Sequence, residues 1–514
     1  MLYASVGSSG ELFSHLWQTV LPTYIANTIK LTVLVVLLSL CFGIPAALLI
    51  SQTDIKSAKY LRWALLLPLA MPAYLVAYLY TDIFDYAGPV QRALRTWFDW
   101  QTASDYWFFD IRTLGGASVI LALVLYPYVY MLTRTALEQQ DKSLLRASRT
   151  LGLNASQALL KIALPLARPA IMVAASLVMM ETIADFATVQ YFAVNTLTTA
   201  IYDTWLGYGD LAAANALASV LLLFVLFAVV AEQKSRAGQR HQSIRPNTST
   251  DIIPLSRGQH IWGNVFCWSL VLFGFALPFA LLIDMAMSYT DQQQLGKLTT
   301  IGLETLKVSA YAATIAVILS LLFALFPRFY QNKGNGLPLQ LSGFGYAVPG
   351  TVLAMALMAT FGPLDHWIND IAVSLGFSKL GLILSGTTFA IIFAFVVRFA
   401  AIANGTISSG IAKIPHSVDK APASLGVGLG TTLARVHLPL LKGSVLVAWL
   451  LVFVEAMKEL PAVLLLRPFN FETLSTFIYQ LISDEQLEQG AIGAIFIVLF
   501  GLIPIVWLNK QDKA

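Results

Sequence analysis

Charge is scarce in this sequence of 514 residues: charged residues make up 12%, hydrophobic residues make up 57%, and the mean hydropathy is +0.71. A soluble chain of this length would divide into several domains and would need a more polar surface. The composition therefore predicts a membrane protein, with the lipid bilayer as its surroundings. Cysteine is scarcer still. Cys41 and Cys267 both lie in apolar runs, so we interpret them as core residues without a disulfide or metal role.

Sequence motifs for enzyme chemistry are also missing. No phosphate-binding loop of the form G-x-x-x-x-G-K-[ST] occurs, so the chain cannot itself hold the phosphates of ATP. The six histidines show no metal-ligand spacing, and no nucleophile–base set stands out. We therefore predict a transport subunit and not an enzyme, with no cofactor bound in this chain.

Long apolar runs are abundant, and runs of about 20 residues are candidates for membrane spans. The candidates are 27–50, 61–84, 114–135, 166–190, 211–231, 261–289, 305–326, 341–361, 382–404, 440–463 and 490–508. They predict an all-α polytopic membrane protein with about 11 transmembrane helices.

The basic residues select one orientation for these spans. Of the 32 Lys and Arg residues, 22 fall on the side that holds segments 134–168 and 405–442, and only six fall in the loops of the other side. The positive-inside rule places the basic side in the cytoplasm. Segment 232–260, which is polar, basic and without apolar periodicity, is then a flexible cytoplasmic linker. Because this rule already explains its charge, we predict no nucleic-acid partner.

Internal repeats divide the chain into two halves. At an offset of 277, Leu197–Tyr202 (LTTAIY) matches Leu474–Tyr479 (LSTFIY). Two further pairs share this offset: 27–31 with 304–308, and Ala70-Met71-Pro72 with Ala347-Val348-Pro349. Both halves have the same orientation, so they are parallel repeats. We predict a first repeat at 24–231, the linker at 232–260, and a second repeat at 261–514 with its core at 300–509.

The span at 261–289 has no counterpart in the first repeat, because residue 278 would pair with residue 1 at this offset. This mismatch predicts that an N-terminal span is missing from the sequence. The alternative is a protein of eleven native spans whose N-terminus lies outside.

Two polar, basic stretches stand between apolar runs at an offset of 274: Ser143–Pro165 and Ser417–Pro439. Each has a central Leu-Gly and a closing Leu-Pro. The glycine allows a sharp bend between two short helices, and the proline suits the first turn of the next helix. Each stretch therefore predicts a compact helical bend on the cytoplasmic side.

Two pairs of carboxylates lie inside apolar runs, also at an offset of 274: Glu181 with Asp185, and Glu455 with Glu459. A spacing of four places each pair on one helical face. Ionised carboxylates in hydrocarbon normally face a cavity or a partner, and their oxygens suit hard cations, of which Fe(III) is one. The pairs either line a transport pathway or belong to a structural ion-pair network with Lys458 and Arg398, and the sequence leaves both open.

The two polar stretches resemble the cytoplasmic coupling loop of ABC importer permeases, whose pattern is Glu-Ala-Ala, three residues, Gly, then Ile-x-Leu-Pro. The matching positions are Ala147, Gly152, Ile162, Leu164 and Pro165 in the first copy, and Ala421, Gly426, Val436, Leu438 and Pro439 in the second. The sequence departs from the family at Arg146 and Lys420, which replace the glutamate. We predict that these two cations meet acidic groups on the ATPase subunit that such a loop contacts.

The carboxylate segments extend this resemblance to the fused permeases that import ferric iron. It rests on Glu181–Phe186, continued by Thr188–Phe192, and on Lys458–Ala462, continued by Leu464–Leu474. The resemblance implies two type I (MetI-like) halves, two cytoplasmic ATPase subunits that bind ATP and Mg, a periplasmic ferric-binding protein, and transient Fe(III) contact at the four carboxylates. It implies a location in the bacterial inner membrane.

Other functions remain open at this point. Related fused permeases carry thiamine or other solutes, so the substrate could differ. A secondary transporter driven by an ion gradient would share the parallel repeats and the intramembrane carboxylates. It would have no evident use for the two bends, and a receptor or scaffold would explain neither feature.

Overall fold

The computed structural model describes residues 10–140, 147–148, 150–237, 253–289, 292–329, 337–415, 417–424 and 426–511. Within these ranges nearly all regular structure is helical, and the single extended pairing is an isolated bridge between Thr53 and Ile253. The prediction of an all-α protein is therefore confirmed. The chain forms two compact units, one of Met1–Ala4 with Asp291–Ile478 and one of Ser5–Thr290 with Tyr479–Ala514, and each is described by itself.

The larger unit contains most of the first repeat, the 257–288 span and the last helix. Its elements are α1 (Gly10–Thr19), α2 (Leu21–Gln52), α3 (Ala58–Ala64), η1 (Leu67–Ala70), α4 (Ala73–Phe84), α5 (Pro89–Phe98), α6 (Leu114–Glu138), α8 (Ala155–Ala158), η2 (Leu159–Ala163), α9 (Leu164–Ala184), α10 (Ala187–Tyr191), α11 (Leu197–Tyr202), η3 (Asp203–Gly207), α12 (Leu211–Ala237), α13 (Arg257–Val271), η4 (Leu272–Ala276), α14 (Leu277–Ser288) and α24 (Leu487–Gln511).

Helices α2, α6 and α9 form the centre of this unit. Small residues let their backbones approach closely: a β-carbon at Gly43 of α2 would lie 2.6 Å from the β-carbon of Val129 on α6. Tyr126 and Tyr130 of α6 are completely buried beside this contact. Cys267 is buried in the same core, as expected, whereas Cys41 is exposed on α2, so its prediction as a core residue was wrong. The apolar run on α2 continues around the helix, so apolarity alone did not identify its packed face.

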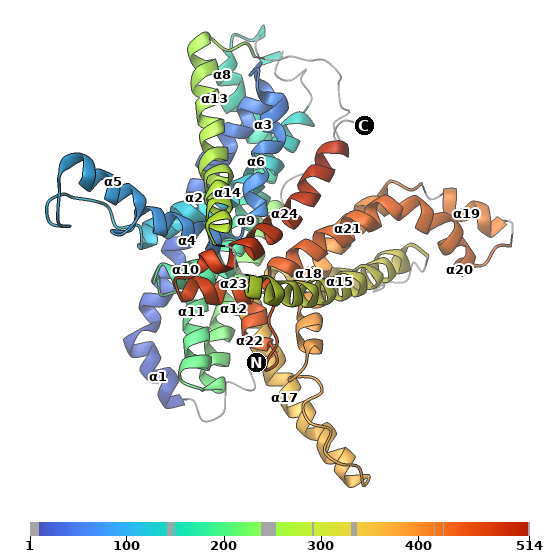
Figure 1. Ribbon diagram of the computed structural model, residues 1–514. Coiled ribbons are helices and arrows are strands. Elements are labelled where there is room, and N and C mark those ends of the chain that lie inside the picture. The colour runs from blue at the N-terminus through green and yellow to red at the C-terminus, as the bar shows by residue number, and fades with distance from the viewer. Residues whose placement is uncertain are drawn as a thin grey trace. The chain divides into compact units, whose positions relative to one another are not determined.

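The smaller unit holds most of the second repeat. Its elements are α15 (Gln292–Phe329), α16 (Leu337–Ser342), η5 (Gly345–Ala347), α17 (Gly350–Ser374), α18 (Thr388–Ala412), α19 (Ser417–Ser424), α20 (Leu429–Thr432), η6 (Leu433–His437), α21 (Leu438–Lys458), α22 (Pro461–Leu466) and the first part of α23 (Leu474–Ser483). Helices α15, α18 and α21 run side by side here (Figure 1). They occupy the repeat positions of α2, α6 and α9, so each unit is built on the same three-helix core.

The repeated Ala-x-Pro triplets mark breaks in the spans. Met71 and Val348 have extended backbone, and Pro72 and Pro349 start α4 and α17. Proline cannot donate the backbone hydrogen bond that would continue the preceding helix. The expected span at 61–84 is interrupted there, and its two parts, Ala58–Ala70 and Ala73–Phe98, meet at 90°.

These breaks change how many continuous spans are visible. Among the described residues, eight helices are long and apolar enough to cross a membrane, and the bent pair would make nine. The expected span at 341–361 is divided between α16 and α17, and the described apolar part of α12, Leu211–Phe227, is shorter than the others. The repeat boundaries at 24–231 and 261–514 stay a prediction, because α13, α14 and α24 pack within the larger unit.

Candidate functional site

The carboxylates Asp185 and Glu459 occupy equivalent breaks in the two repeats. Helix α9 ends at Ala184 and α21 ends at Lys458, so each carboxylate lies just past a helix end, on extended backbone. A short helix, α10 or α22, follows each break. Because the long helix does not continue, the second acid of each pair is positioned by the break and not by an uninterrupted helical face.

In the larger unit, Asp185 binds the start of the following helix. Thr188 Oγ1 donates a hydrogen bond of 2.9 Å to Asp185 Oδ2, and the Val189 N–H donates one of 3.1 Å to Oδ1. Both donors belong to α10, so the carboxylate satisfies the otherwise unpaired N–H groups of that helix. Among the described residues no cation pairs with Asp185, and its recorded partners are neutral.

In the smaller unit, Glu459 combines a helix contact with a buried ion pair. The Ala462 N–H of α22 donates a hydrogen bond of 3.2 Å to Glu459 Oε1, and Arg398 Nη1 of α18 lies 3.5 Å from the same oxygen. The two charged side chains are only 6% and 8% exposed. Gly350 of α17 makes room for the pair, because a β-carbon there would overlap Glu459 Oε1 and lie 2.6 Å from Arg398 Nη1.

The first acid of each pair lies one turn earlier. Glu181 is half-buried in the last turn of α9. In α21, Glu455 forms an ion pair with Lys458, with 3.1 Å between Oε1 and Nζ. Lys458 and Arg398, the two cations expected in a structural network, therefore both contact carboxylates in the second repeat. The transport-pathway role of Glu181, Asp185, Glu455 and Glu459 stays a prediction.

Hydroxyl side chains fix both breaks in the same way, which explains the LTTAIY and LSTFIY repeats. Thr198 Oγ1 donates to the carbonyl of Asp185 at 2.8 Å, and Ser475 Oγ donates to the carbonyl of Glu459 at 2.9 Å. The backbone N–H groups of Leu197 and Leu474 donate to Thr28 Oγ1 and Thr305 Oγ1, at 3.0 and 2.8 Å. Thr28 of α2 and Thr305 of α15 are themselves a repeated pair. Each thus joins the segment that begins at Leu197 or Leu474 to the first helix of its three-helix core.

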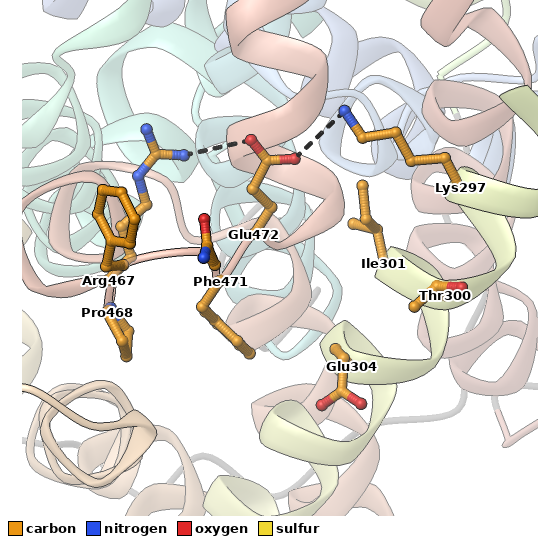
Figure 2. A pocket seen from close by; sticks show the side chains of 10 residues that line it. Lys297, Thr300, Ile301, Glu304, Arg467, Pro468, Phe471 and Glu472 are labelled. Atoms are coloured by element: carbon orange, nitrogen blue, oxygen red, sulfur yellow. Dashed lines mark ion pairs between the residues drawn. The ribbon is translucent and has the colours of Figure 1, made fainter.

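A charged pocket of about 600 Å³ lies next to this segment in the second repeat. Figure 2 shows Lys297 on α15 reaching toward Glu472 on the loop after α22, with Arg467 on the other side of that carboxylate, whereas the Glu304 carboxylate points away from them. Glu472 lies between the cations, 3.9 Å from Lys297 Nζ and 3.8 Å from Arg467 Nη1. Phe469, on the same loop, is 95% exposed.

The first repeat lacks this charged pocket at the matching positions. The offset of 277 replaces its four charges by Val20, Asn27, Gln190 and Asn195. There Asn27 Nδ2 donates to the carbonyl of Asn195 at 3.1 Å and joins the two segments directly. Sequence reasoning missed the pocket. The signal that could have found it is four charges in one repeat against none in the other.

The two bends predicted on the cytoplasmic side have the expected glycine geometry. Gly152 and Gly426 have φ values of +91° and +72°, a region that residues with a β-carbon rarely adopt. After each glycine the chain folds back: the Leu153 N–H donates to the carbonyl of Ser148 at 3.1 Å, and the Val427 N–H donates to that of Pro422 at 3.0 Å. Both hydrogen bonds follow the six-to-one pattern of a glycine-terminated helix.

The closing Leu-Pro pairs also have matched geometry. Pro165 and Pro439 lie in the first turn of α9 and α21, and a π-helical turn, η2 or η6, precedes each of them. The N–H groups of Leu164 and Leu438 reach back five residues, to the carbonyls of Leu159 and Leu433. Such a turn accommodates the proline, which lacks an N–H of its own.

Other predicted coupling positions are only partly described. Ala147 and Ala421 are helical, as is Lys420, but the structure does not describe the side chains of residues 420 and 421. Arg146 lies outside the described residues. The ATPase-coupling role of these positions stays a prediction.

Replacing Gly152 or Gly426 by valine should strain the backbone alone, because a β-carbon at either glycine would meet no heavy atom within 4 Å. The left-handed conformation costs a residue with a β-carbon about 1–2 kcal/mol, and more when it is β-branched. We expect normal membrane insertion with loss of transport and of ATPase stimulation, measured on purified complexes. Asparagine at the same positions is the matched control, because it tolerates this conformation. Full coupled activity in both valine variants would contradict the prediction.

These features define an integral membrane transport subunit built from two fused repeats. Residues 39–236 match the family described as binding-protein-dependent transport system inner membrane component. The chain is 32% identical over 179 residues to the molybdenum transport system permease protein ModB of Escherichia coli, a match that covers 35% of the chain and 72% of that protein. The chain belongs to this family of binding-protein-dependent transport permeases. It is accordingly a multi-pass component of the inner membrane.

Other relatives match nearly the whole chain. The Fe(3+)-transport system permease protein FbpB 2 of Haemophilus influenzae is 24% identical over 496 residues, which cover 95% of this chain and 89% of that protein. The ferric transport system permease protein FbpB of Actinobacillus pleuropneumoniae is 24% identical over 524 residues, covering 97% and 73%. Both repeats of this chain therefore align within one continuous permease sequence.

Proposed function

We propose that this chain carries ferric iron across the inner membrane as the permease of an ATP-driven importer. The observation that carries the proposal is the length of the match to permeases named for ferric transport, which covers 95% and 97% of the chain. The match to the molybdenum permease covers 72% of that protein and 35% of this chain, so it compares one repeat. The ferric permeases compare both repeats, and therefore both halves of a pathway, with this chain.

The chemistry of the helix breaks supports a cation as the substrate. Asp185 and Glu459 bring carboxylate oxygens to equivalent breaks, and Glu181 and Glu455 lie one turn away in each repeat. Fe(III) is a hard cation that prefers oxygen ligands, so these four acids are suited to transient contact with it. The same acids would repel an oxyanion such as molybdate.

Partners supply the energy and the substrate in this proposal. Two cytoplasmic ATPase subunits bind ATP and Mg and dock on the bends at Gly152 and Gly426. A periplasmic ferric-binding protein delivers iron to the outer face. The chain itself contributes the pathway, and movement of its helices couples hydrolysis to transport.

Iron uptake in proteoliposomes tests this function. The complex of permease and ATPase should import radioactive iron from the loaded binding protein only while ATP is present inside. Collapse of the proton gradient with ATP maintained should leave uptake unchanged, whereas ATP depletion with the gradient held should stop it. Competition with excess thiamine and molybdate separates the substrates. Uptake that follows the gradient, or transport of either competitor in place of iron, would overturn the proposal.

A further inference from the structure

Arg328 joins three parts of the smaller unit at the end of α15. Its side chain is 5% exposed, and its Nε donates a hydrogen bond of 2.9 Å to Asp419 Oδ2 on α19. Its Nη1 and Nη2 donate to the carbonyls of Ile411 and Ile414, at 3.0 and 2.9 Å, and Nη2 also reaches Pro415 O at 3.2 Å. One guanidinium thus connects α15, the last turn of α18 and the first helix of the second bend.

Asp419 extends this connection to the start of α21. Its Oδ1 lies 3.1 Å from His437 Nε2, and the His437 side chain is completely buried. The His437 ring packs edge-on against Phe329, with 5.3 Å between ring centroids. His437 is the last residue of η6, immediately before Leu438 and Pro439. The carboxylate of Asp419 therefore contacts both Arg328, which precedes the second bend, and His437, near the end of that bend.

The geometry favours a rigid connection. A guanidinium is planar and presents its N–H groups in a fixed fork, so four acceptors on two segments, α19 and the end of α18, determine its position. Three of these acceptors are carbonyls at and just beyond the C-terminus of α18, where a cation is also favoured by the helix dipole. Burial reduces competition from water for each of these contacts.

The sequence of the first repeat has no charged or ionisable side chain at the three matching positions. The offsets of the two repeats place Ser51, Leu145 and Ala163 at the positions of Arg328, Asp419 and His437. The recorded contact there is neutral: Gln140 Nε2, beyond the end of α6, donates to the carbonyl of Ala163 at 2.9 Å. Ala163 is the last residue of η2, as His437 is of η6. Among the described residues, the end of η2 is thus contacted by an amide, where the end of η6 carries a buried imidazole beside a carboxylate.

We propose that Arg328, Asp419 and His437 form a joint that fixes the second bend to the helices beside it. Through this joint the second bend moves as one body with α15 and α18. This inference rests on the proposed function, in which both bends dock on ATPase subunits. Arg328 and Asp419 are positioning residues: they transmit the movement of the second bend to the helices that carry Glu459 and Arg398.

Hydrogen exchange on the purified full chain tests the joint without any partner. In Asp419→Asn, the amides of Ser417–Ser424 and of the last turn of α18 should exchange about tenfold faster or more, because the segment loses its anchor. Arg328→Lys keeps the charge but loses the fork, so it should accelerate exchange in the same segments. Glu138→Gln is the matched control, since Glu138 forms ion pairs of 3.6 Å with Arg62 and Arg134 within the other compact unit. Unchanged exchange in both joint variants would overturn the proposal.

Coupling in the assembled complex tests the mechanical role. Asp419→Asn should lower the ratio of iron imported to ATP hydrolysed about fivefold or more while ATPase subunits still bind. Asp419→Glu should restore the ratio, and Glu138→Gln should leave it unchanged. Faster exchange with an unchanged ratio would show that the joint only stabilises the fold, which rejects its role in coupling. If the unmodified complex imports no iron but Asp419→Asn still accelerates exchange selectively, the assignment of iron fails and the joint stands.

Discussion

Replacing Gly350 by alanine is expected to lower the melting temperature and iron uptake together, because overpacking a buried site by one β-carbon costs about 1–3 kcal/mol of folding stability. The added carbon would overlap Glu459 Oε1 and lie 2.6 Å from Arg398 Nη1 and 3.2 Å from the Ala462 nitrogen. These atoms form the buried ion pair and the start of α22, so the carbon would separate the pair or displace the short helix.

The control for this variant is Gly405→Ala on α18, the helix that carries Arg398. A β-carbon at Gly405 would meet no heavy atom within 4 Å. Alanine in a helix interior is favoured over glycine by about 0.5–1 kcal/mol, so this variant should melt at the same or a slightly higher temperature. Uptake by Gly350→Ala that matches uptake by Gly405→Ala would show that close packing around the ion pair is not required.

The single amides of Asp185 and Glu459 should separate the two interpretations of the carboxylates. Glu459→Gln breaks the buried ion pair with Arg398 by neutralising one member, and breaking a buried pair in this way costs up to about 3–5 kcal/mol, so melting temperature and uptake should fall together. Asp185→Asn retains an oxygen that accepts from Thr188 or Val189, so its stability should change by about 1 kcal/mol or less. Its uptake should still fall if Asp185 contacts the substrate.

The measurement is paired: iron uptake in vesicles and melting temperature in detergent, with Glu181→Gln and Glu455→Gln included. Loss of uptake at constant melting temperature in Asp185→Asn and Glu181→Gln would support a transport pathway in the first repeat. Parallel loss in every variant would support a structural network. Normal uptake in all four would reject the pathway role.

Local features of the fold were predictable because they depend on neighbouring residues. Glycine alone adopts the left-handed conformation without strain, so Gly152 and Gly426 could be identified as bends from the repeated Leu-Gly. Pro165 and Pro439 could likewise be placed in the first turn of the next helix, because a proline there needs no backbone N–H. The Ala-x-Pro triplets were identified as repeats, but their effect on helix direction was not. A proline predicts an interruption, whereas the 90° bend at Pro72 depends on how the adjoining helices pack.

The sequence by itself determined the membrane class and the two repeats, because hydropathy and spacing are properties of the chain. Charge placement predicts the orientation, which stays a prediction. Only the tertiary structure decided which charges meet. Arg398 and Glu459 are 61 positions apart, and Arg328 and Asp419 are 91 positions apart. Their contacts are set by the packing of α15, α18 and α21, which helical periodicity leaves undetermined. Burial then makes each of these contacts specific, because a charge removed from water is stable only beside a precisely placed partner.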